Sequence, residues 1–178
     1  MAVMRPSRDE DVPALAAIYA HHVLFGTGTF ETEAPSVLEM SVRRADVLAK
    51  GLPYLVLEEY GVIAGFAYAT WFKARPAYRY SAEDSIYLAA GQHRKSLGRA
   101  LLAELVLQCE AAGIRKMIAV IGDSANLSSV GVHLALGYSE VGKIDACGWK
   151  LGQWRDIVIM QKTLGAGNTT PPDNAGAT

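Results

Sequence analysis

A short apolar strand that leads into a basic turn and a long periodic helix constrains this chain most. The strand is expected at residues 85–88 and the turn at residues 92–98, and the helix carries Leu97, Leu101, Leu102, Leu105 and Val106. Where a strand leads into a helix, backbone N–H groups point at one spot and the helix dipole adds positive charge. Four basic side chains lie there: His93, Arg94, Lys95 and Arg99. The pattern predicts a phosphate or pyrophosphate site; the alternative is an ordinary connection with solvated basic residues.

The size and composition fit a single globular domain. The chain has 178 residues, of which 51% are hydrophobic and 20% charged, and its formal net charge is −1. A chain of this length can bury a core of its own, and a net charge near zero creates no field that recruits nucleic acid or an anionic membrane. No apolar run is long enough to span a bilayer, and the N-terminus lacks a signal-peptide core. We therefore expect a cytoplasmic protein without nucleic-acid or membrane partners.

The two cysteines, Cys109 and Cys147, lack metal-ligand spacing and have apolar neighbours in the sequence. We expect buried, reduced thiols, and a disulfide is the less favoured alternative. No metal site is expected.

The hydrophobic periodicity predicts an α+β fold. Helices are expected at residues 9–25, 36–50, 97–112 and 128–136, and strands at residues 1–4, 54–57, 62–72, 85–88, 116–121, 138–147 and 154–162. This order indicates a mixed sheet with helices packed on its faces. The second helix carries an apolar stripe of Val37, Leu38, Val42, Ala45 and Leu48. The last residues, 165–178, are small, polar and Pro-rich, which predicts a domain over residues 1–164 and a disordered tail.

This order of elements, together with several short motifs, resembles the GNAT acetyltransferase superfamily and, within it, the phosphinothricin N-acetyltransferase subgroup. The motifs are the basic turn and the segments at residues 73–78 (KARPAY), 119–122 (AVIG), 133–138 (HLALGY) and 148–154 (GWKLGQW). The resemblance covers about residues 3–163. It implies a mixed, mostly antiparallel central sheet flanked by helices, acetyl-CoA as co-substrate and a homodimer. Trp149 and Trp154 are expected either to line the acceptor pocket or to form the dimer contact.

The family's pyrophosphate signature, Gln/Arg-x-x-Gly-x-Gly/Ala, falls on His93, Arg94, Lys95, Ser96, Leu97 and Gly98. The sequence departs from it twice, because His93 replaces Gln or Arg and Ser96 replaces the first glycine. Glycine lets the backbone approach a phosphate without a Cβ in the way, and serine is small and carries a hydroxyl donor. The resemblance therefore implies that this turn, with Arg99, binds acetyl-CoA.

The resemblance also implies where the pantetheine arm of acetyl-CoA lies. The backbone of Tyr87, Leu88 and Ala89 would pair with the pantetheine amides like an added strand. Asn126 matches the family asparagine that hydrogen-bonds the same arm. Its alternative role as a helix N-cap is compatible with that contact.

Two titratable residues are the candidates for proton transfer. An acceptor amine arrives as an ammonium ion, so the resemblance implies that Glu83, placed before the central strand, takes its proton directly or through a water. The alternative for Glu83 is a solvated acidic residue at a strand start. His133 stands where the subgroup has histidine and titrates near neutrality. It would protonate the departing thiolate or share the base role; the alternative is a core histidine bonded to a backbone carbonyl.

The acceptor side is expected at two segments. Phe30 and Glu31 belong to a Thr-Phe-Glu segment that resembles the family's acceptor-pocket lining. Arg75 and Tyr78 lie in the loop at residues 73–80, where an arginine could clamp a carboxylate through two hydrogen bonds.

The leading hypothesis is an acetyl-CoA-dependent N-acetyltransferase acting on a small amino-acid-like amine, such as phosphinothricin or methionine sulfoximine. Direct transfer is expected because no nucleophilic cysteine is placed to form an acyl-enzyme. Two alternatives remain open at this point: an acetyltransferase for another amine (an antibiotic, a polyamine or a protein N-terminus), and a non-catalytic acyl-CoA-binding module.

Overall fold

The computed structural model describes residues 2–92 and 95–172, and over these residues the chain forms one seven-stranded mixed sheet. Its strand order is β1-β2-β3-β4-β5-β7-β6, and every neighbouring pair is antiparallel except β4 and β5. The strands are β1 (Ala2–Pro6), β2 (Tyr54–Glu59), β3 (Val62–Trp71), β4 (Ser81–Leu88), β5 (Lys116–Gly122), β6 (Ser139–Lys150) and β7 (Gln153–Thr163). The predicted mixed, mostly antiparallel sheet is confirmed.

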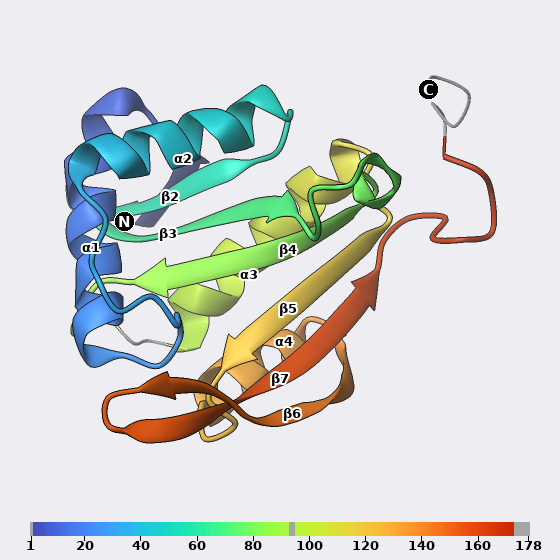
Figure 1. Cartoon of the computed structure of the whole chain (residues 1–178). Coiled ribbons are helices and arrows are strands. Elements are labelled where there is room, and N and C mark those ends of the chain that lie inside the picture. Colours follow the sequence, from blue (N-terminus) through green and yellow to red (C-terminus); the bar gives the residue numbers. More distant parts are fainter. Residues whose placement is uncertain (1, 93–94, 173–178) are drawn as a thin grey trace.

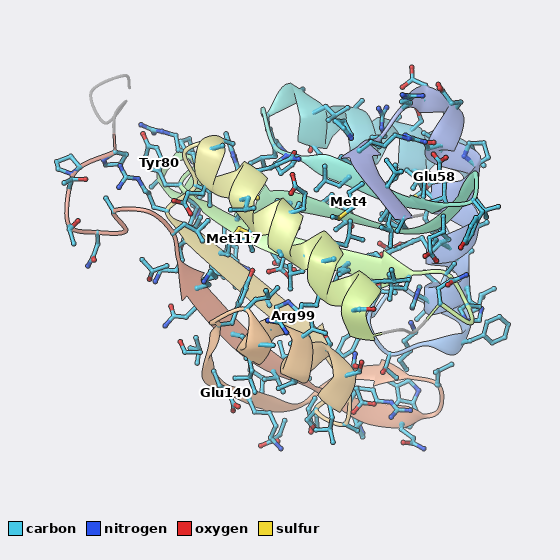
Figure 2. All side chains as sticks on the ribbon, turned by 180° about the vertical axis from the view of Figure 1, so that it is seen from behind. Met4, Glu58, Tyr80, Arg99, Met117 and Glu140 are labelled. Carbon is cyan, nitrogen blue, oxygen red and sulfur yellow. The ribbon has the colours of Figure 1, made fainter. Side chains whose placement is uncertain are left out.

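The helices cover both faces of this sheet. Helices α1 (Val12–Phe25) and α2 (Val37–Ala49) lie on one face, and α3 (Lys95–Ala111) and α4 (Leu127–Ala135) on the other (Figures 1 and 2). A short 3-10 turn at Asp9–Asp11 precedes α1. A second 3-10 turn, at Pro76–Tyr78, lies within the predicted loop before β4. Among the described residues, no helix is long and apolar enough to cross a membrane.

Helix α2 forms where expected, but its predicted apolar stripe is not its buried face. Four stripe residues are 41% to 74% exposed: Val37, Leu38, Val42 and Leu48. The buried residues are instead Met40, Arg44 and Val47. Arg44 can be buried because its guanidinium donates to the Ser7 hydroxyl at 2.7 Å and to the Ser7 carbonyl at 2.6 Å. A paired arginine can thus take a core position that an apolar pattern does not reveal.

Strands β4 and β5 pair over three residues only and then separate. Glu83 and Ile118 are the last pair of this parallel ladder. Beyond them β4 stays paired with β3 up to Leu88, and β5 with β7 up to Gly122. The sheet therefore opens between β4 and β5 (Figure 1), and the side of β4 that faces this opening has no strand partner on β5.

Two details correct the sequence interpretation. β4 begins at Ser81 rather than at residue 85, so Glu83 lies inside the strand and its side chain is fixed to one face. Cys109 is buried as expected, but Cys147 is exposed, so the prediction of two buried thiols is wrong for Cys147. The reason is that β6 is the edge strand of the sheet, where apolar sequence neighbours provide no cover.

Residues 165–172 continue beyond β7 in hydrogen-bonded turns. The backbone N–H of Gly167 donates to the Leu164 carbonyl at 2.9 Å, and that of Thr169 to the Ala166 carbonyl at 3.0 Å. Residues 173–178 lie outside the described residues. The domain boundary at residue 164 and the disordered tail therefore stay predictions.

Candidate active site

A cavity of about 790 Å³ occupies the opening between β4 and β5. Its wall comes from the end of α1 and the loop after it, the second half of β4, the end of β5 and the start of α4. Seven of the predicted site residues line it: Phe30, Glu83, Tyr87, Leu88, Gly98, Asn126 and His133. Residues from several separate elements thus meet in a space large enough for a small ligand.

Glu83 lies at the point where the two strands part. Side chains alternate along a strand, so Glu83 shares its face with Tyr87, whose ring contacts Tyr19 of α1 edge-on at 5.0 Å. Burial raises the pKa of Glu83, the charge of Asp84 raises it further, and Lys73 opposes the rise. A carboxylate with a raised pKa is suited to accept a proton from an ammonium ion.

The next residue, Asp84, points to the opposite face and is part of a buried cluster. Its Oδ1 atom lies 3.0 Å from Nε2 of His133, and its Oδ2 atom accepts a hydrogen bond from the Tyr138 hydroxyl at 2.8 Å. The second ring nitrogen of His133, Nδ1, lies 2.8 Å from the Ser129 carbonyl oxygen. Both ring nitrogens of His133 therefore have partners, and Glu83 is not one of them.

The pKa of His133 is raised. Burial alone lowers it, but the hydrogen bond and the charge of Asp84 outweigh burial, and the Ser129 carbonyl adds to the rise. The side chain of His133 is only 2% exposed. A buried histidine next to a carboxylate is thus held toward its protonated form.

The residues expected to hold acetyl-CoA are only partly gathered at the cavity. Tyr87, Leu88, Gly98 and Asn126 line it, whereas the N–H of Ala89 donates to the Ala64 carbonyl at 2.9 Å within the sheet. Asn126 also caps α4, because its side chain accepts from the Ser129 N–H at 3.2 Å.

The predicted pyrophosphate turn is described in part. Lys95, Ser96, Leu97 and Arg99 belong to the first turns of α3, and Ser96 and Arg99 line a second, shallower hollow beside Leu136. His93 and Arg94 lie outside the described residues. Binding of the pyrophosphate by this turn stays a prediction.

The loop after α1 forms the wall of the cavity at which the acceptor is predicted to bind, the acceptor-side wall. Phe30 packs against Gly148 and Gly122: a Cβ at Gly148 would overlap the Phe30 ring, and one at Gly122 would overlap the Thr27 carbonyl. Lys150, only 4% exposed, donates from Nζ to the Thr29 carbonyl at 2.6 Å. The hairpin of β6 and β7 therefore holds this loop in place.

Three predicted acceptor residues do not line the cavity. Glu31 instead accepts hydrogen bonds from the Tyr19 hydroxyl at 2.9 Å and from Arg43 at 2.7 Å. Arg75 and Tyr78 are exposed around the 3-10 turn that precedes β4. This turn lies at the start of β4, whereas the residues of β4 that line the cavity run from Glu83 to the end of the strand. Contact of Arg75 or Tyr78 with an acceptor stays a prediction.

Comparison with known proteins identifies the fold. The sequence model of the Acetyltransferase (GNAT) family matches residues 15–138. The chain is 47% identical over 170 residues to a phosphinothricin N-acetyltransferase of Alcaligenes faecalis, covering 96% of this chain and 86% of that protein. The chain belongs to the GNAT acetyltransferase family.

Two further relatives support membership of this family. An L-methionine sulfoximine/L-methionine sulfone acetyltransferase of Pseudomonas aeruginosa is 33% identical over 177 residues, which is 96% of this chain and 99% of that one. The crystal structure of a GNAT superfamily phosphinothricin acetyltransferase from Sinorhizobium meliloti in complex with AcCoA has a TM-score of 0.94 and 43% identity, over 97% of this chain and 94% of that chain. The predicted family, fold and acetyl-CoA-dependent N-acetyltransferase activity are confirmed.

Sequence reasoning overlooked two residues of this acetyltransferase's site. Asp84 directly follows Glu83 in the sequence, but the predicted strand began after both residues, so its face was not predicted, and only Glu83 matched the family pattern. Lys150 lies within the family motif at residues 148–154, but the motif gave no sign of its burial, because burial of a lysine depends on which carbonyls surround it. In the described part of the chain, no group of three or more His, Cys, Asp or Glu side chains could hold a metal ion.

Proposed function

We propose that this acetyltransferase transfers the acetyl group of acetyl-CoA directly to the amine of a small amino-acid-like acceptor of the phosphinothricin or methionine sulfoximine type. The observation that carries the proposal is the place of Glu83, a half-buried carboxylate with a raised pKa at the vertex of the cavity. The names of the two curated relatives supply the class of acceptor.

The acceptor is tested by measuring thiol release from acetyl-CoA over a panel of amines. We expect phosphinothricin, methionine sulfoximine and methionine sulfone to be acetylated, and an aminoglycoside, a polyamine and a peptide N-terminus to react at least 10²-fold less efficiently. Preference for any of the second group would contradict the proposed acceptor class. CoA binding without any turnover would favour a non-catalytic module.

Direct transfer is tested separately, since Cys147 is exposed and lines the cavity. We expect intact mass spectrometry after incubation with acetyl-CoA alone to show no acetyl adduct on the protein. A stoichiometric adduct on Cys147 would indicate an acyl-enzyme instead.

In the proposed binding mode, the backbone of β4 holds the pantetheine arm and the start of α3 holds the pyrophosphate. Gly98 lines the cavity, and a Cβ there would meet only side-chain carbons, the nearest at 3.6 Å. Gly98→Ala should therefore fold well but raise the acetyl-CoA dissociation constant about tenfold, or about 1.4 kcal/mol. Gly131→Ala in α4 is the matched control, because a Cβ there meets nothing within 4 Å. Equal affinities by calorimetry would overturn this binding mode.

We also propose that the protein is a cytoplasmic homodimer. Trp149 and Trp154 pack edge-to-face at 5.4 Å on the β6–β7 hairpin while remaining 59% and 64% exposed. Exposed aromatic pairs suit a protein–protein contact. Sedimentation should show a dimer at micromolar concentration. Trp154→Lys should dissociate it, whereas Tyr60→Lys, at an 88% exposed tyrosine away from this hairpin, should not.

A further inference from the structure

We propose that Asp84 is a positioning residue that acts through His133: it keeps both ring nitrogens of His133 protonated, so that Glu83, and not His133, accepts the proton of the acceptor amine. The kinetic part of this proposal rests on the proposed function. The structural part concerns only the protonation of His133 and does not depend on the proposed function.

The hydrogen-bond partners of His133 limit which of its two ring nitrogens can be protonated. The Ser129 carbonyl can only accept, so Nδ1 of His133, 2.8 Å away, must carry a hydrogen. The contact between Nε2 and Asp84 at 3.0 Å then holds one further proton. If this proton lies on Nε2, the pair is an imidazolium and a carboxylate; if it lies on Asp84, the pair is neutral.

The surroundings of Asp84 favour the first arrangement. Its side chain is 2% exposed, and Tyr138 donates a hydrogen bond to its other oxygen at 2.8 Å, a contact that stabilises a carboxylate. Two further titratable groups interact with Asp84, Cys109 of α3 and Glu83 of β4 itself, and neither of them supplies a positive charge. The positive charge of the His133 imidazolium therefore offsets the desolvation cost of burying the Asp84 carboxylate.

An imidazolium with both N–H groups engaged has no lone pair to accept a proton. Over the reaction the acceptor ammonium loses two protons: one passes through Glu83 to solvent, and one ends on the CoA sulfur after the carbon–sulfur bond breaks. His133 also lines the cavity. Its positive charge there favours the negative charge that develops on the departing sulfur, which is how Asp84 influences the rate.

The first experiment measures the protonation of His133 in the unmodified protein. Long-range ¹H–¹⁵N spectra of protein labelled at histidine distinguish a protonated ring nitrogen from one with a lone pair, and His133→Gln assigns the signals. We expect both His133 nitrogens to be protonated at pH 7. A lone pair on Nε2 at that pH would overturn the proposal.

The second experiment removes the charge and keeps the contacts. In Asp84→Asn, a neutral His133 can still donate from Nδ1 and accept from the new amide, whose oxygen can accept from Tyr138. We expect Nε2 to lose its proton, kcat to fall about tenfold and both KM values to stay within twofold. Tyr138→Phe is the matched control: it removes a hydrogen bond from the same carboxylate, and His133 should remain doubly protonated. Loss of the proton in both variants would mean that packing, not charge, sets it.

The third experiment assigns the base. His133→Gln should lower kcat about tenfold and retain the acidic limb of the pH–rate profile, because Glu83 sets that limb. The double variant Asp84→Asn/His133→Gln should be no slower than the slower single variant, since Asp84 acts through His133. Loss of the acidic limb in His133→Gln would make His133 the base and overturn the proposal. If no amine is acetylated by the wild-type protein, the proposed function fails, and the spectra still decide the protonation of His133.

Discussion

On one face of β4, Asp84 is held by His133 at 3.0 Å and by Tyr138 at 2.8 Å, and its side chain is 2% exposed. On the other face, one residue earlier, Glu83 lies half-buried at the cavity wall, where burial and the neighbouring Asp84 raise its pKa. Identical functional groups thus have opposite surroundings. A carboxylate with its hydrogen bonds satisfied stabilises the fold, and one desolvated without such partners is prepared to take a proton.

The largest expected effect of a substitution at either carboxylate is the loss of turnover on changing Glu83. Glu83→Gln removes the proposed proton acceptor and should lower kcat by about 10²–10⁴-fold, with little change in acetyl-CoA affinity. Steady-state kinetics at saturating acceptor measure the effect. Glu140→Gln, an exposed glutamate on β6 (Figure 2), is the matched control and should behave like wild type. Near-normal turnover of Glu83→Gln would mean that the amine loses its proton to solvent.

Asp84 should dominate stability instead. Asp84→Ala leaves Nε2 of His133 and the Tyr138 hydroxyl without their buried partner and should cost about 3 kcal/mol in urea unfolding. Asp46→Ala, at a surface ion pair with Lys50, should cost less than about 0.5 kcal/mol. Similar losses would show that the buried cluster contributes no special stability.

The stability that Asp84 provides should depend on pH through His133. The raised pKa of His133 means that its contribution is fully present below its ordinary value of 6.5 and is lost as pH rises through the folded-state pKa. The cost of Asp84→Ala should therefore be larger at pH 6 than at pH 9. A cost that is constant over this range would contradict a protonated His133.

The acceptor-side wall can be displaced without touching either carboxylate. Gly148→Ala forces the Phe30 ring away from its place and should raise the acceptor KM about tenfold, or about 1.4 kcal/mol. Gly142→Ala lies on the same strand with nothing within 4 Å of its Cβ and should leave KM unchanged. An equal effect of both substitutions would indicate a general weakness of β6 instead of a specific contact.

The smallest expected effect is a gain in stability from Glu83→Gln. Because the pKa of Glu83 is raised in the fold, its ionisation costs stability as pH rises from about 4.5 through the folded-state value. Gln has no such cost, so the variant should match wild type near pH 4 and gain about 1 kcal/mol at pH 7, or ~2–4 °C in Tm. A variant that is less stable at pH 7 would show that Glu83 is well satisfied in the fold.

Much of this site could be predicted from the sequence and its family resemblance. The order of the elements and several motifs resembled the GNAT superfamily, and that resemblance implied Glu83, Tyr87, Leu88 and Gly98, all of which line the cavity. His133 was found through the family pattern. It lines the cavity and is bonded to a backbone carbonyl, as one of the two hypotheses expected, and its role in proton transfer stays a prediction. Local patterns succeed here because backbone geometry and hydrophobic periodicity are properties of neighbouring residues.

The remaining features depended on contacts between distant segments. Sequence alone determined the order of the elements and the motifs of the family. Only the tertiary structure decided that Asp84 meets His133, 49 residues away, and that Lys150 reaches Thr29, 121 residues away. It also decided that α2 buries Arg44 in place of its apolar stripe. Burial and pairing of a polar group depend on which distant partners the fold brings within hydrogen-bonding distance, and local sequence carries no record of that distance.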